Sequence, residues 1–324
     1  MSQPILQVRN LTVEYATPEG SACAVNDVSF ELAAGEFLAI VGESGCGKST
    51  LLFAIAQLLS SPAEVTGGSV LFNGVDMTSL SDEELRNLRW KDISVVMQSA
   101  MNALNPILTI GAQLTDTCRA HTDWTEAQIA ARSLEVLSMV SIDAVHLNSY
   151  AFQLSGGMRQ RAMIAMALLL NPKLIIMDEP TSALDVVAQR SLMSQIQALR
   201  KKLGFSVIFV THDMNVVSHF SDRLAVMYAG QFVELGKTQE VFLHPKHPYS
   251  MGLMDAFPAL VGERKDLVGI PGNPPSLVTR LHGCYFAPRC DKVQAICTTE
   301  IPPINDIASN LSRCHFLNFE NGNK

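Results

Sequence analysis

The sequence has no hydrophobic run long enough to cross a membrane. Its most apolar stretch, residues 162–170, is nine residues long, whereas a transmembrane helix needs about 20 apolar residues. The first residues also lack the basic and then apolar pattern of a secretory signal peptide. We therefore expect a chain that neither spans a bilayer nor is exported by that route.

Positive charge is also scarce. Lys and Arg together number 24 against 31 Asp and Glu, which gives a formal net charge of −7, and charged residues of both signs make up only 17% of the chain. A chain of this balance is not attracted to the phosphate backbone of a nucleic acid, and no local basic cluster compensates for it. We therefore expect no nucleic-acid partner.

Glycine and proline are too few for a collagen-like or low-complexity chain, at 20 and 15 of 324 residues, while hydrophobic residues reach 48%. A chain of this length and composition buries its own core and has room for about two domains. After residue 243 the regular hydrophobic patterns give way to a proline-rich, loop-like tail. We expect one domain over residues 1–243 and a small extension over residues 244–324.

Short apolar runs predict two kinds of strand. The continuously apolar runs, typical of parallel strands buried on both faces, are residues 37–41, 174–177 and 207–210. The alternating runs, typical of half-exposed antiparallel strands, are residues 5–15, 69–77 and 224–235. We expect hairpin turns at Asn73-Gly74 and near Ala229-Gly230. Helical patterns lie between the continuous runs, so the sequence predicts an α/β fold around a parallel sheet.

A helical segment interrupts this rhythm between about residues 99 and 160. Thr125 and Gln128 have the spacing of a capping box at the start of a helix. The apolar residues that follow recur near helical spacing. We therefore expect a helical insertion within the α/β domain.

Residues 42–49, with the sequence GESGCGKS, lie between an apolar run and a helix-compatible segment. In that context the pattern predicts a phosphate-binding loop, because glycines let successive N–H groups face a phosphate and the helix N-terminus adds partial positive charge. Lys48 would bridge the β and γ oxygens of a nucleotide, and the Ser49 hydroxyl would bind Mg²⁺. The residues expected to hold the nucleotide are Gly42, Ser44, Gly45, Cys46, Gly47, Lys48, Ser49 and Thr50.

Asp178 and Glu179 follow the apolar run 174–177. They therefore stand at the carboxyl end of a predicted strand, where open α/β sheets bind their ligands. Asp178 would hold the magnesium ion, and Glu179 would act as general base toward the attacking water. A solvated turn at the end of a strand is the alternative, and the phosphate loop favours the catalytic interpretation.

Ser155, Gly156 and Gly157 begin an apolar helix that reaches residue 170. The N–H groups at such a helix start suit an anion, so they predict a second phosphate-contacting surface. With the phosphate loop before it and the Asp-Glu pair after it, this segment resembles the signature sequence of the ATP-binding cassette family, and the resemblance covers residues 5–236. Met158 is a departure, because the commonest family version has Gln there.

This resemblance implies a P-loop NTPase fold with a RecA-like core, an antiparallel β subdomain and the helical insertion. It also implies that two cassettes close head to tail, each covering the nucleotide that the other holds. Tyr15 resembles the aromatic residue that stacks on adenine, although a surface aromatic at a strand end is the alternative. Asp185 lies in the loop 182–185, which resembles the loop that crosses the dimer seam.

The resemblance also assigns the remaining catalytic groups. Gln98 resembles the glutamine that contacts Mg²⁺ and water, and His212 the histidine that hydrogen-bonds the γ-phosphate and orients the base. The expected catalytic residues are thus Gln98, Glu179 and His212. The expected magnesium ligands are Ser49, Gln98 and Asp178.

The tail resembles the C-terminal extension of the oligopeptide and dipeptide importer ATPases. The stretches that carry this resemblance are residues 247–258, 269–277 and 283–290. It implies an ATPase at the cytoplasmic face of the inner membrane that works with a second related ATPase, two membrane permease subunits and an extracytoplasmic substrate-binding protein. Peptide is the expected cargo, with glutathione, a metal chelate or an oligosaccharide as alternatives; nucleic-acid processing is the less favoured role for such an ATPase.

Four of the seven cysteines gather in the tail: Cys284, Cys290, Cys297 and Cys314. Four soft ligands suit zinc or an iron-sulfur cluster, and the absence of tight C-x-x-C spacing favours the larger group. Some importer ATPases that the tail resembles hold a 4Fe-4S cluster at these cysteines. Zinc, free buried thiols and an added redox-sensing role are the alternatives. We expect Arg289 and His315 to cover or tune the site.

Overall fold

The computed structural model describes residues 3–98, 103–182, 184–256, 269–279, 282–307 and 310–316. The chain divides into two compact units. The first unit comprises Met1–Ile5, Leu32–Phe37 and Phe72–Thr211, and the second comprises Leu6–Glu31, Leu38–Leu71 and His212–Lys324. Among the described residues, no helix has both the length and the apolar character needed to span a membrane.

Three strands of the first unit pair in parallel: β6 (Ile93–Val96), β7 (Leu174–Asp178) and β8 (Ser206–Val210). The middle strand, β7, pairs with both neighbours. Every residue of β7 and β8 is buried, which explains why these segments are continuously apolar. The predicted parallel strands at residues 174–177 and 207–210 are confirmed.

The helices of this unit are α2 (Asp82–Leu88), α3 (Ile110–His121), α4 (Glu126–Met139), α5 (Gly156–Leu168) and α6 (Val186–Leu203). Among the described residues of this unit, the short elements are β5 (Val75–Asp76) and 3-10 helices at Met77–Ser79, Ala144–Asn148 and Ala151–Gln153.

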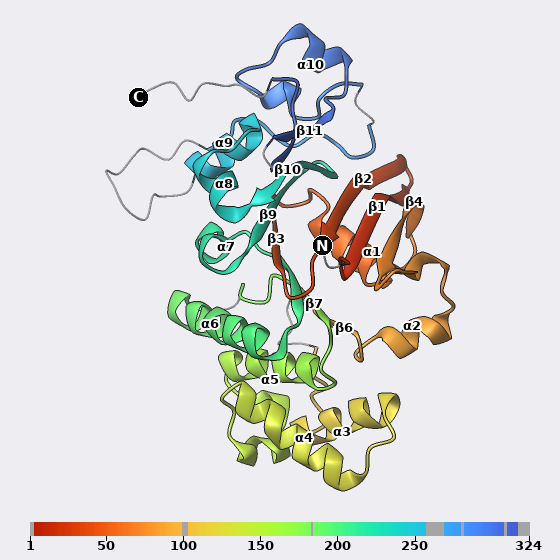
Figure 1. Ribbon diagram of the computed structural model, residues 1–324, viewed down its shortest axis with the longest axis vertical. Helices are drawn as coiled ribbons and strands as arrows, with labels where there is room; N and C mark the ends of the chain where they lie inside the picture. The colour runs from red at the N-terminus through yellow and green to blue at the C-terminus, as the bar shows by residue number, and fades with distance from the viewer. Residues whose placement is uncertain are drawn as a thin grey trace. The chain divides into compact units, whose positions relative to one another are not determined.

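The predicted helical insertion is present. Its helices α3 and α4 pack together, and α5 lies beside α4 (Figure 1). The capping box is confirmed, because the Thr125 hydroxyl accepts a hydrogen bond from the Gln128 N–H and the Gln128 side chain accepts one from the Thr125 N–H. The first residues of the predicted insertion, 99–102, lie outside the described residues.

Most strands belong to the second unit: β1 (Leu6–Thr17), β2 (Gly20–Leu32), β3 (Phe37–Val41), β4 (Ala63–Phe72), β9 (Arg223–Tyr228), β10 (Gln231–Lys237), β11 (Ile304–Ile307) and β12 (Asn310–Arg313). Its helices are α1 (Lys48–Ile55), α7 (Met214–Phe220), α8 (Thr238–Leu243), α9 (Pro248–Asp255), α10 (Ala295–Thr299) and a 3-10 turn, η5 (Ala287–Arg289).

Strand β1 lies between β2 and β4. Only residues 18–19 separate β1 from β2, and so short a connection requires an antiparallel hairpin. Burial along β1 largely alternates, as the sequence predicts for a half-exposed strand. The turn at Asn73-Gly74 joins β4 to β5 as predicted.

Strands β3 and β9 are parallel, with Leu38 opposite Arg223, and β9 then forms an antiparallel hairpin with β10. Ala229 and Gly230 make the predicted turn with φ values of 45° and 82°. Positive φ at both central residues is the geometry that suits a tight hairpin.

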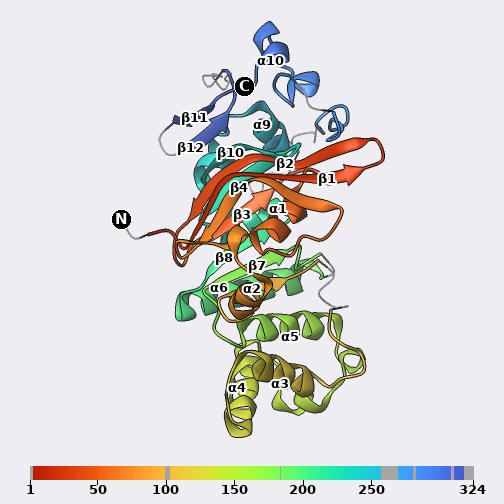
Figure 2. The same cartoon turned by 90° about the vertical axis from the view of Figure 1, so that its right-hand side faces the viewer.

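The tail contains more regular structure than its sequence predicts. Residues 304–313 form the hairpin β11–β12, and β12 pairs with β10 so that Ser312 lies opposite Glu234. Figure 2 shows the hairpin alongside β10 and α9. The expectation of a loop-like tail is therefore wrong for these residues, because the edge of β10 supplies the hydrogen bonds that the short segment cannot make alone.

Aromatic rings join the tail to the rest of its unit. The ring of Tyr228 in β9 lies 4.6 Å from that of Tyr249 in α9 and 5.3 Å from that of Phe286, measured between centroids. The carboxylate of Glu234 is 1% exposed and accepts hydrogen bonds from the N–H groups of Lys246 and His247. These contacts fix α9 and the cysteine-bearing segment against β9 and β10.

Candidate functional site

The loop 42–49 connects β3 to α1, as predicted. Gly47 precedes α1 with a φ of 104°, a left-handed value that glycine adopts without strain. A Cβ at Gly47 would collide with the carbonyl oxygen of Ala24, and one at Gly42 would collide with the carbonyl oxygen of Met227. The path of the loop backbone therefore depends on glycine at both positions.

Lys48 lies within the curve of this loop and is 8% exposed. Its Nζ donates hydrogen bonds to the carbonyl oxygens of Gly42, at 2.9 Å, and of Glu43, at 2.8 Å. These bonds hold the ammonium group beside the N-terminus of α1, where the helix favours a bound anion.

The other loop residues differ in exposure. Ser44 and Gly45 are exposed, while Ser49 and Thr50 are partly buried on the first turn of α1. Cys46 is buried, and burial raises the pKa of its thiol above the ordinary value. The Cys46 side chain therefore packs the loop as a neutral group, and only its backbone can face a phosphate.

Tyr15 lies in β1, which contacts α1, the helix that follows the loop 42–49. Its hydroxyl is hydrogen-bonded to the hydroxyl of Thr50, with 3.1 Å between the two oxygens. The structure therefore brings together two predicted nucleotide-binding residues from segments far apart in the sequence.

Replacing Tyr15 by Ala is expected to weaken ATP binding by about 1 kcal/mol, the size of one aromatic stacking contact. Titration of a fluorescent ATP analogue measures this change. Tyr15→Phe is the matched control, because it keeps the ring and loses only the bond to Thr50, and it should retain most of the affinity. An unchanged affinity in Tyr15→Ala would make Tyr15 an ordinary surface aromatic.

In the first unit, Asp178 is the last residue of β7 and is 2% exposed. Glu179 follows with a φ of 44°, a left-handed conformation that is uncommon for a non-glycine residue. The N–H of Glu179 donates to the carbonyl oxygen of Val210 at 2.9 Å, and its own carbonyl oxygen accepts from the Ser182 hydroxyl at 3.2 Å. These bonds hold Glu179 in its strained conformation, as is common at functional sites.

The side chain of Glu179 contacts a second predicted catalytic residue. Nε2 of Gln98 donates a hydrogen bond to Oε2 of Glu179 at 3.2 Å, and both side chains are reachable by solvent. The amide orients the carboxylate at a place that solvent can reach. This is the arrangement that a general base requires.

The glycine pair lies where the sequence predicts it, at the start of α5. Ser155 caps this helix, because its hydroxyl accepts a hydrogen bond from the Met158 N–H at 3.3 Å. Ser155 is exposed, and Gly156 and Gly157 are partly buried. The first turn of α5 therefore offers N–H groups at the surface, and the departure at Met158 leaves this geometry intact.

Asp185 caps the next helix, α6, through a hydrogen bond from the Ala188 N–H at 2.8 Å. The two residues that follow it, Val186 and Val187, are 78% and 80% exposed. Ala183, within the predicted seam loop, lies outside the described residues. The loop is thus followed, in the first turn of α6, by an apolar pair that faces solvent.

The residues predicted for catalysis and for binding nucleotide and magnesium belong to both units. Gln98, Asp178 and Glu179 lie in the first, and Lys48 and His212 lie in the second. His212 is exposed and follows β8 by two residues in the chain. Joint action of these groups on one nucleotide stays a prediction.

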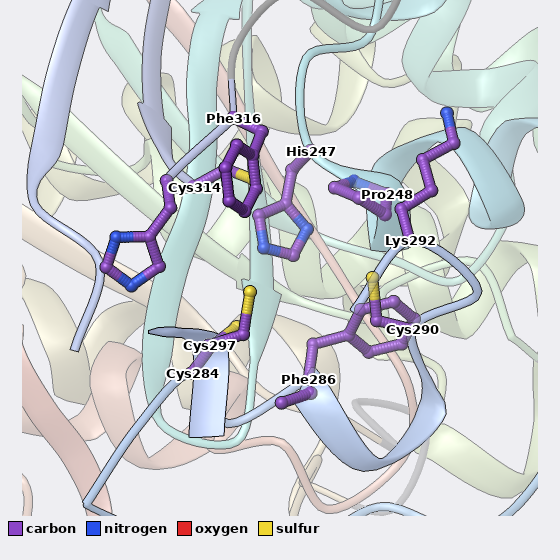
Figure 3. A pocket seen from close by; sticks show the side chains of 11 residues that line it. His247, Pro248, Cys284, Phe286, Cys290, Lys292, Cys297, Cys314 and Phe316 are labelled. Carbon is purple, nitrogen blue, oxygen red and sulfur yellow. The ribbon is translucent and has the colours of Figure 1, made fainter. Parts of the chain in front are cut away.

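The four tail cysteines line one pocket (Figure 3). All four are free thiols. His247, Pro248, Phe286 and Phe316 also line this pocket, so its walls are largely apolar, and His315 lies there as predicted. A pocket of free thiols with apolar walls fits a metal group bound by thiolates.

The thiols do not form a ready-made metal site. Within the part of the chain that the structure describes, no group of three or more Cys, His, Asp or Glu side chains is arranged to hold a metal ion. Burial raises the pKa of Cys284, Cys290 and Cys314 above the ordinary value, so these thiols are protonated at neutral pH. A bound metal would have to displace those protons.

Two residues of the tail contact the phosphate loop, which the sequence does not predict. Arg289, expected to cover the cysteines, instead directs its guanidinium to the carboxylate of Glu43. The hydroxyl of Tyr249 accepts a hydrogen bond from the Glu43 N–H. No sequence signal could have found these contacts, because 246 and 206 positions separate the partners.

Comparisons with known proteins give two family matches. Residues 25–182 match the ABC transporter family, and residues 233–297 match the oligopeptide/dipeptide transporter C-terminal region.

Curated relatives match over nearly the whole chain. The oligopeptide transport ATP-binding protein OppD of Haemophilus influenzae is 45% identical over 89% of both chains. The OppD of Salmonella typhimurium is 43% identical over 96% of this chain and 93% of its own. The dipeptide transport ATP-binding protein DppD of Bacillus subtilis is 44% identical over 93% of this chain and 90% of its own.

Solved structures share the fold. A dimer of the ATP-binding cassette MJ0796, in a post-hydrolysis state bound to ADP and phosphate, has a TM-score of 0.65 and 32% identity over 72% of this chain and 98% of that chain. The cbiO1 protein of Clostridium perfringens, part of the transporter complex cbiONQ, has a TM-score of 0.66 and 27% identity over 75% of this chain and 92% of that chain. The predicted cassette fold is thereby confirmed.

Proposed function

The chain belongs to the ATP-binding cassette family, among the ATPase subunits of oligopeptide and dipeptide transporters, and from this premise we propose how its residues divide the work of ATP hydrolysis. The protein is an ATP-hydrolysing subunit of a peptide importer. The observation that carries the assignment of the base is the hydrogen bond from Gln98 to Glu179.

In this proposal the loop 42–49 binds the phosphates of ATP and Tyr15 stacks on the adenine. Mg²⁺, a hard cation that prefers oxygen ligands, would be held by Ser49, Gln98 and Asp178 and would neutralise charge on the phosphates. Glu179 accepts a proton from the attacking water. His212 hydrogen-bonds the γ-phosphate and orients that base.

The second cassette completes the site. Ser155, Gly156 and Gly157 of this chain cover the nucleotide that the partner cassette holds, and Asp185 lies in the seam between the two. The exposed pair Val186 and Val187 supports this proposal, because adjacent large apolar side chains at the surface are typical of an interaction surface.

The helical insertion contacts the permease subunits in this proposal. Large apolar side chains are exposed on it near the start of α3. The segment around Ser149 lies beside this helix start, since the N–H of Ile110 donates a hydrogen bond to the carbonyl oxygen of Ser149. The rings of Tyr150 and Phe152 stack there with 5.5 Å between their centroids. The exposed fractions are 78% for Ile107, 66% for Val145 and 67% for Phe152. The chain would thus lie at the cytoplasmic face of the inner membrane, with a substrate-binding protein delivering peptide from the other side.

Stimulation of ATP hydrolysis by cargo tests this function. The measurement uses the purified transporter complex with its substrate-binding protein in lipid vesicles, and compares peptides with glutathione, a metal chelate and an oligosaccharide. We expect di- and oligopeptides to stimulate hydrolysis. Stimulation by one of the other compounds and not by peptides would contradict a peptide cargo.

We further propose that the four tail cysteines hold a 4Fe-4S cluster that cross-links the tail. The shared pocket and the free thiols support it. Anaerobically purified protein is expected to contain about four iron atoms per chain and to absorb visible light.

Two variants sharpen this measurement. Cys290→Ser should lose the iron, while Cys118→Ser, which removes a buried cysteine of α3, should keep it. A folded, colourless chain without iron would contradict the cluster, and one zinc ion per chain would favour the zinc alternative.

A further inference from the structure

Glu43, the second residue of the phosphate loop, is held by two residues of the C-terminal tail. Nη1 of Arg289 donates to Oε2 of Glu43 at 2.8 Å, and Nη2 donates to Oε1 at 2.9 Å. The hydroxyl of Tyr249 accepts a hydrogen bond from the Glu43 N–H at 3.0 Å. The tail thus binds both the side chain and the backbone of one loop residue.

Arg289 is itself fixed in place. Its Nε donates to the carbonyl oxygen of Pro271 at 2.8 Å, and its Nη2 donates to that of Ile270 at 3.3 Å. Its guanidinium carbon lies 5.7 Å from the ring centre of Tyr228 and 5.9 Å from that of Phe286. The side chain is only 5% exposed. The Arg289–Glu43 ion pair is bidentate and its guanidinium is shielded from water, so its geometry is better fixed than that of a surface ion pair.

The two peptide groups that flank Glu43 both bind the lysine expected to meet the phosphates. The carbonyl oxygen of Gly42, which shares a peptide group with the Glu43 N–H, accepts a hydrogen bond from Nζ of Lys48, and so does the carbonyl oxygen of Glu43 in the next peptide group. Glu43 therefore lies between the Lys48 ammonium group, which would bind the phosphates, and the two tail residues that hydrogen-bond to Glu43. Any shift of Arg289 or Tyr249 would displace the peptide on which Lys48 rests.

We propose that Arg289 and Tyr249 are positioning residues of the nucleotide site, which hold the phosphate loop in its binding conformation before ATP arrives. A loop fixed in advance does not lose conformational freedom on binding, so the contact raises affinity for nucleotide. The inference rests on the proposed role of the loop 42–49 in binding ATP. Because Arg289 directly precedes Cys290, the same contacts tie the nucleotide site to the cysteine pocket.

The test compares ATP affinity, KM and kcat of variants in the purified transporter complex. Arg289→Met is expected to weaken ATP binding about 10-fold, the loss typical of a hydrogen bond to a charged group, and to raise KM in proportion while kcat at saturating ATP changes little. Tyr249→Phe removes one hydroxyl and is expected to weaken binding about 3-fold, the size of a neutral hydrogen bond.

Arg313→Met is the matched control. Arg313 is also a buried arginine of the tail that directly precedes a cysteine, but it pairs with Asp27, at 3.5 Å, and not with the loop. We expect this variant to bind ATP as the unaltered protein does. If Arg289 merely held the tail in place, both variants would change ATP affinity alike, and that result would overturn the proposal.

A double variant locates the effect. Glu43→Ala combined with Arg289→Met should bind ATP no more weakly than either single variant, because both remove the same contact; additive losses would overturn the proposal. Should Arg289→Met fail to fold, unchanged ATP affinity in Tyr249→Phe would overturn it. Lys48→Ala in the same assay separates this proposal from the proposed role of the loop 42–49 in binding ATP. If Lys48→Ala loses ATP binding and Arg289→Met does not, only the positioning role is overturned. If Lys48→Ala binds ATP fully, the ATP-binding role of the loop is overturned.

Discussion

Glu179→Gln is expected to stop steady-state ATP hydrolysis and to leave ATP binding intact. Glutamine keeps the shape of the side chain and can still meet Gln98, but it cannot accept a proton from water. Loss of a general base typically costs a factor of about 10²–10⁴ in rate. The backbone of residue 179, with its φ of 44° and its N–H bonded to Val210, holds the substituted side chain in the same place.

Phosphate release by the purified complex measures this loss, and equilibrium titration measures ATP binding. Glu135→Gln is the matched control, because it removes a carboxylate of α4 that is 56% exposed and forms an ion pair with Arg132 on the helix surface. We expect full activity in that control. Undiminished turnover in Glu179→Gln would remove Glu179 from the role of base.

Lys48→Ala is expected to reduce ATP affinity by about two orders of magnitude, the range for a charged hydrogen-bonding group removed from a phosphate site. Two effects add up. The nucleotide loses a cation, and the loop loses the hydrogen bonds that Lys48 makes to the carbonyl oxygens of Gly42 and Glu43.

Titration with a fluorescent ATP analogue measures the change in Lys48→Ala. Lys173→Ala serves as its control, because Lys173 is a surface lysine, 59% exposed, in an ion pair with Asp92. An affinity in Lys48→Ala equal to that of the control would exclude Lys48 from the nucleotide site.

Local sequence patterns predicted those elements whose structure depends on residues within the same segment. The continuous apolar runs became β3, β7 and β8, because a strand buried on both faces has no polar position to alternate with. The Thr125–Gln128 capping box starts α4, because both of its hydrogen bonds are made within four residues.

The tail hairpin could not be predicted in this way. Strands β11 and β12 span only four residues each, and such short polar segments have little strand preference of their own. Their structure depends on the edge of β10, where Ser312 lies opposite Glu234. Because β10 is distant in the sequence from β11 and β12, the local sequence pattern of these two strands does not indicate the pairing.

The site shows the same division. The order of the motifs led to the loop 42–49, to Glu179 and to the start of α5, since each motif combines residue type with the element it begins or ends. The ion pair between Arg289 and Glu43 could not be predicted from the sequence, because 246 positions separate the two residues and only tertiary structure brings them together. The sequence placed Arg289 beside the cysteines, and only the fold shows where its side chain points.

In the proposed mechanism ATP joins two cassettes, with the glycine pair of one covering the nucleotide of the other. The most direct measurement is the mass of the Glu179→Gln protein by analytical ultracentrifugation, with and without ATP, alongside a Glu179→Gln/Gly156→Asp double variant. We expect ATP to produce a two-cassette species in the first protein and not in the second, where a carboxylate faces the phosphates. A protein that binds ATP yet stays a monomer, and whose unaltered form hydrolyses ATP at the same specific rate however far it is diluted, would contradict the account.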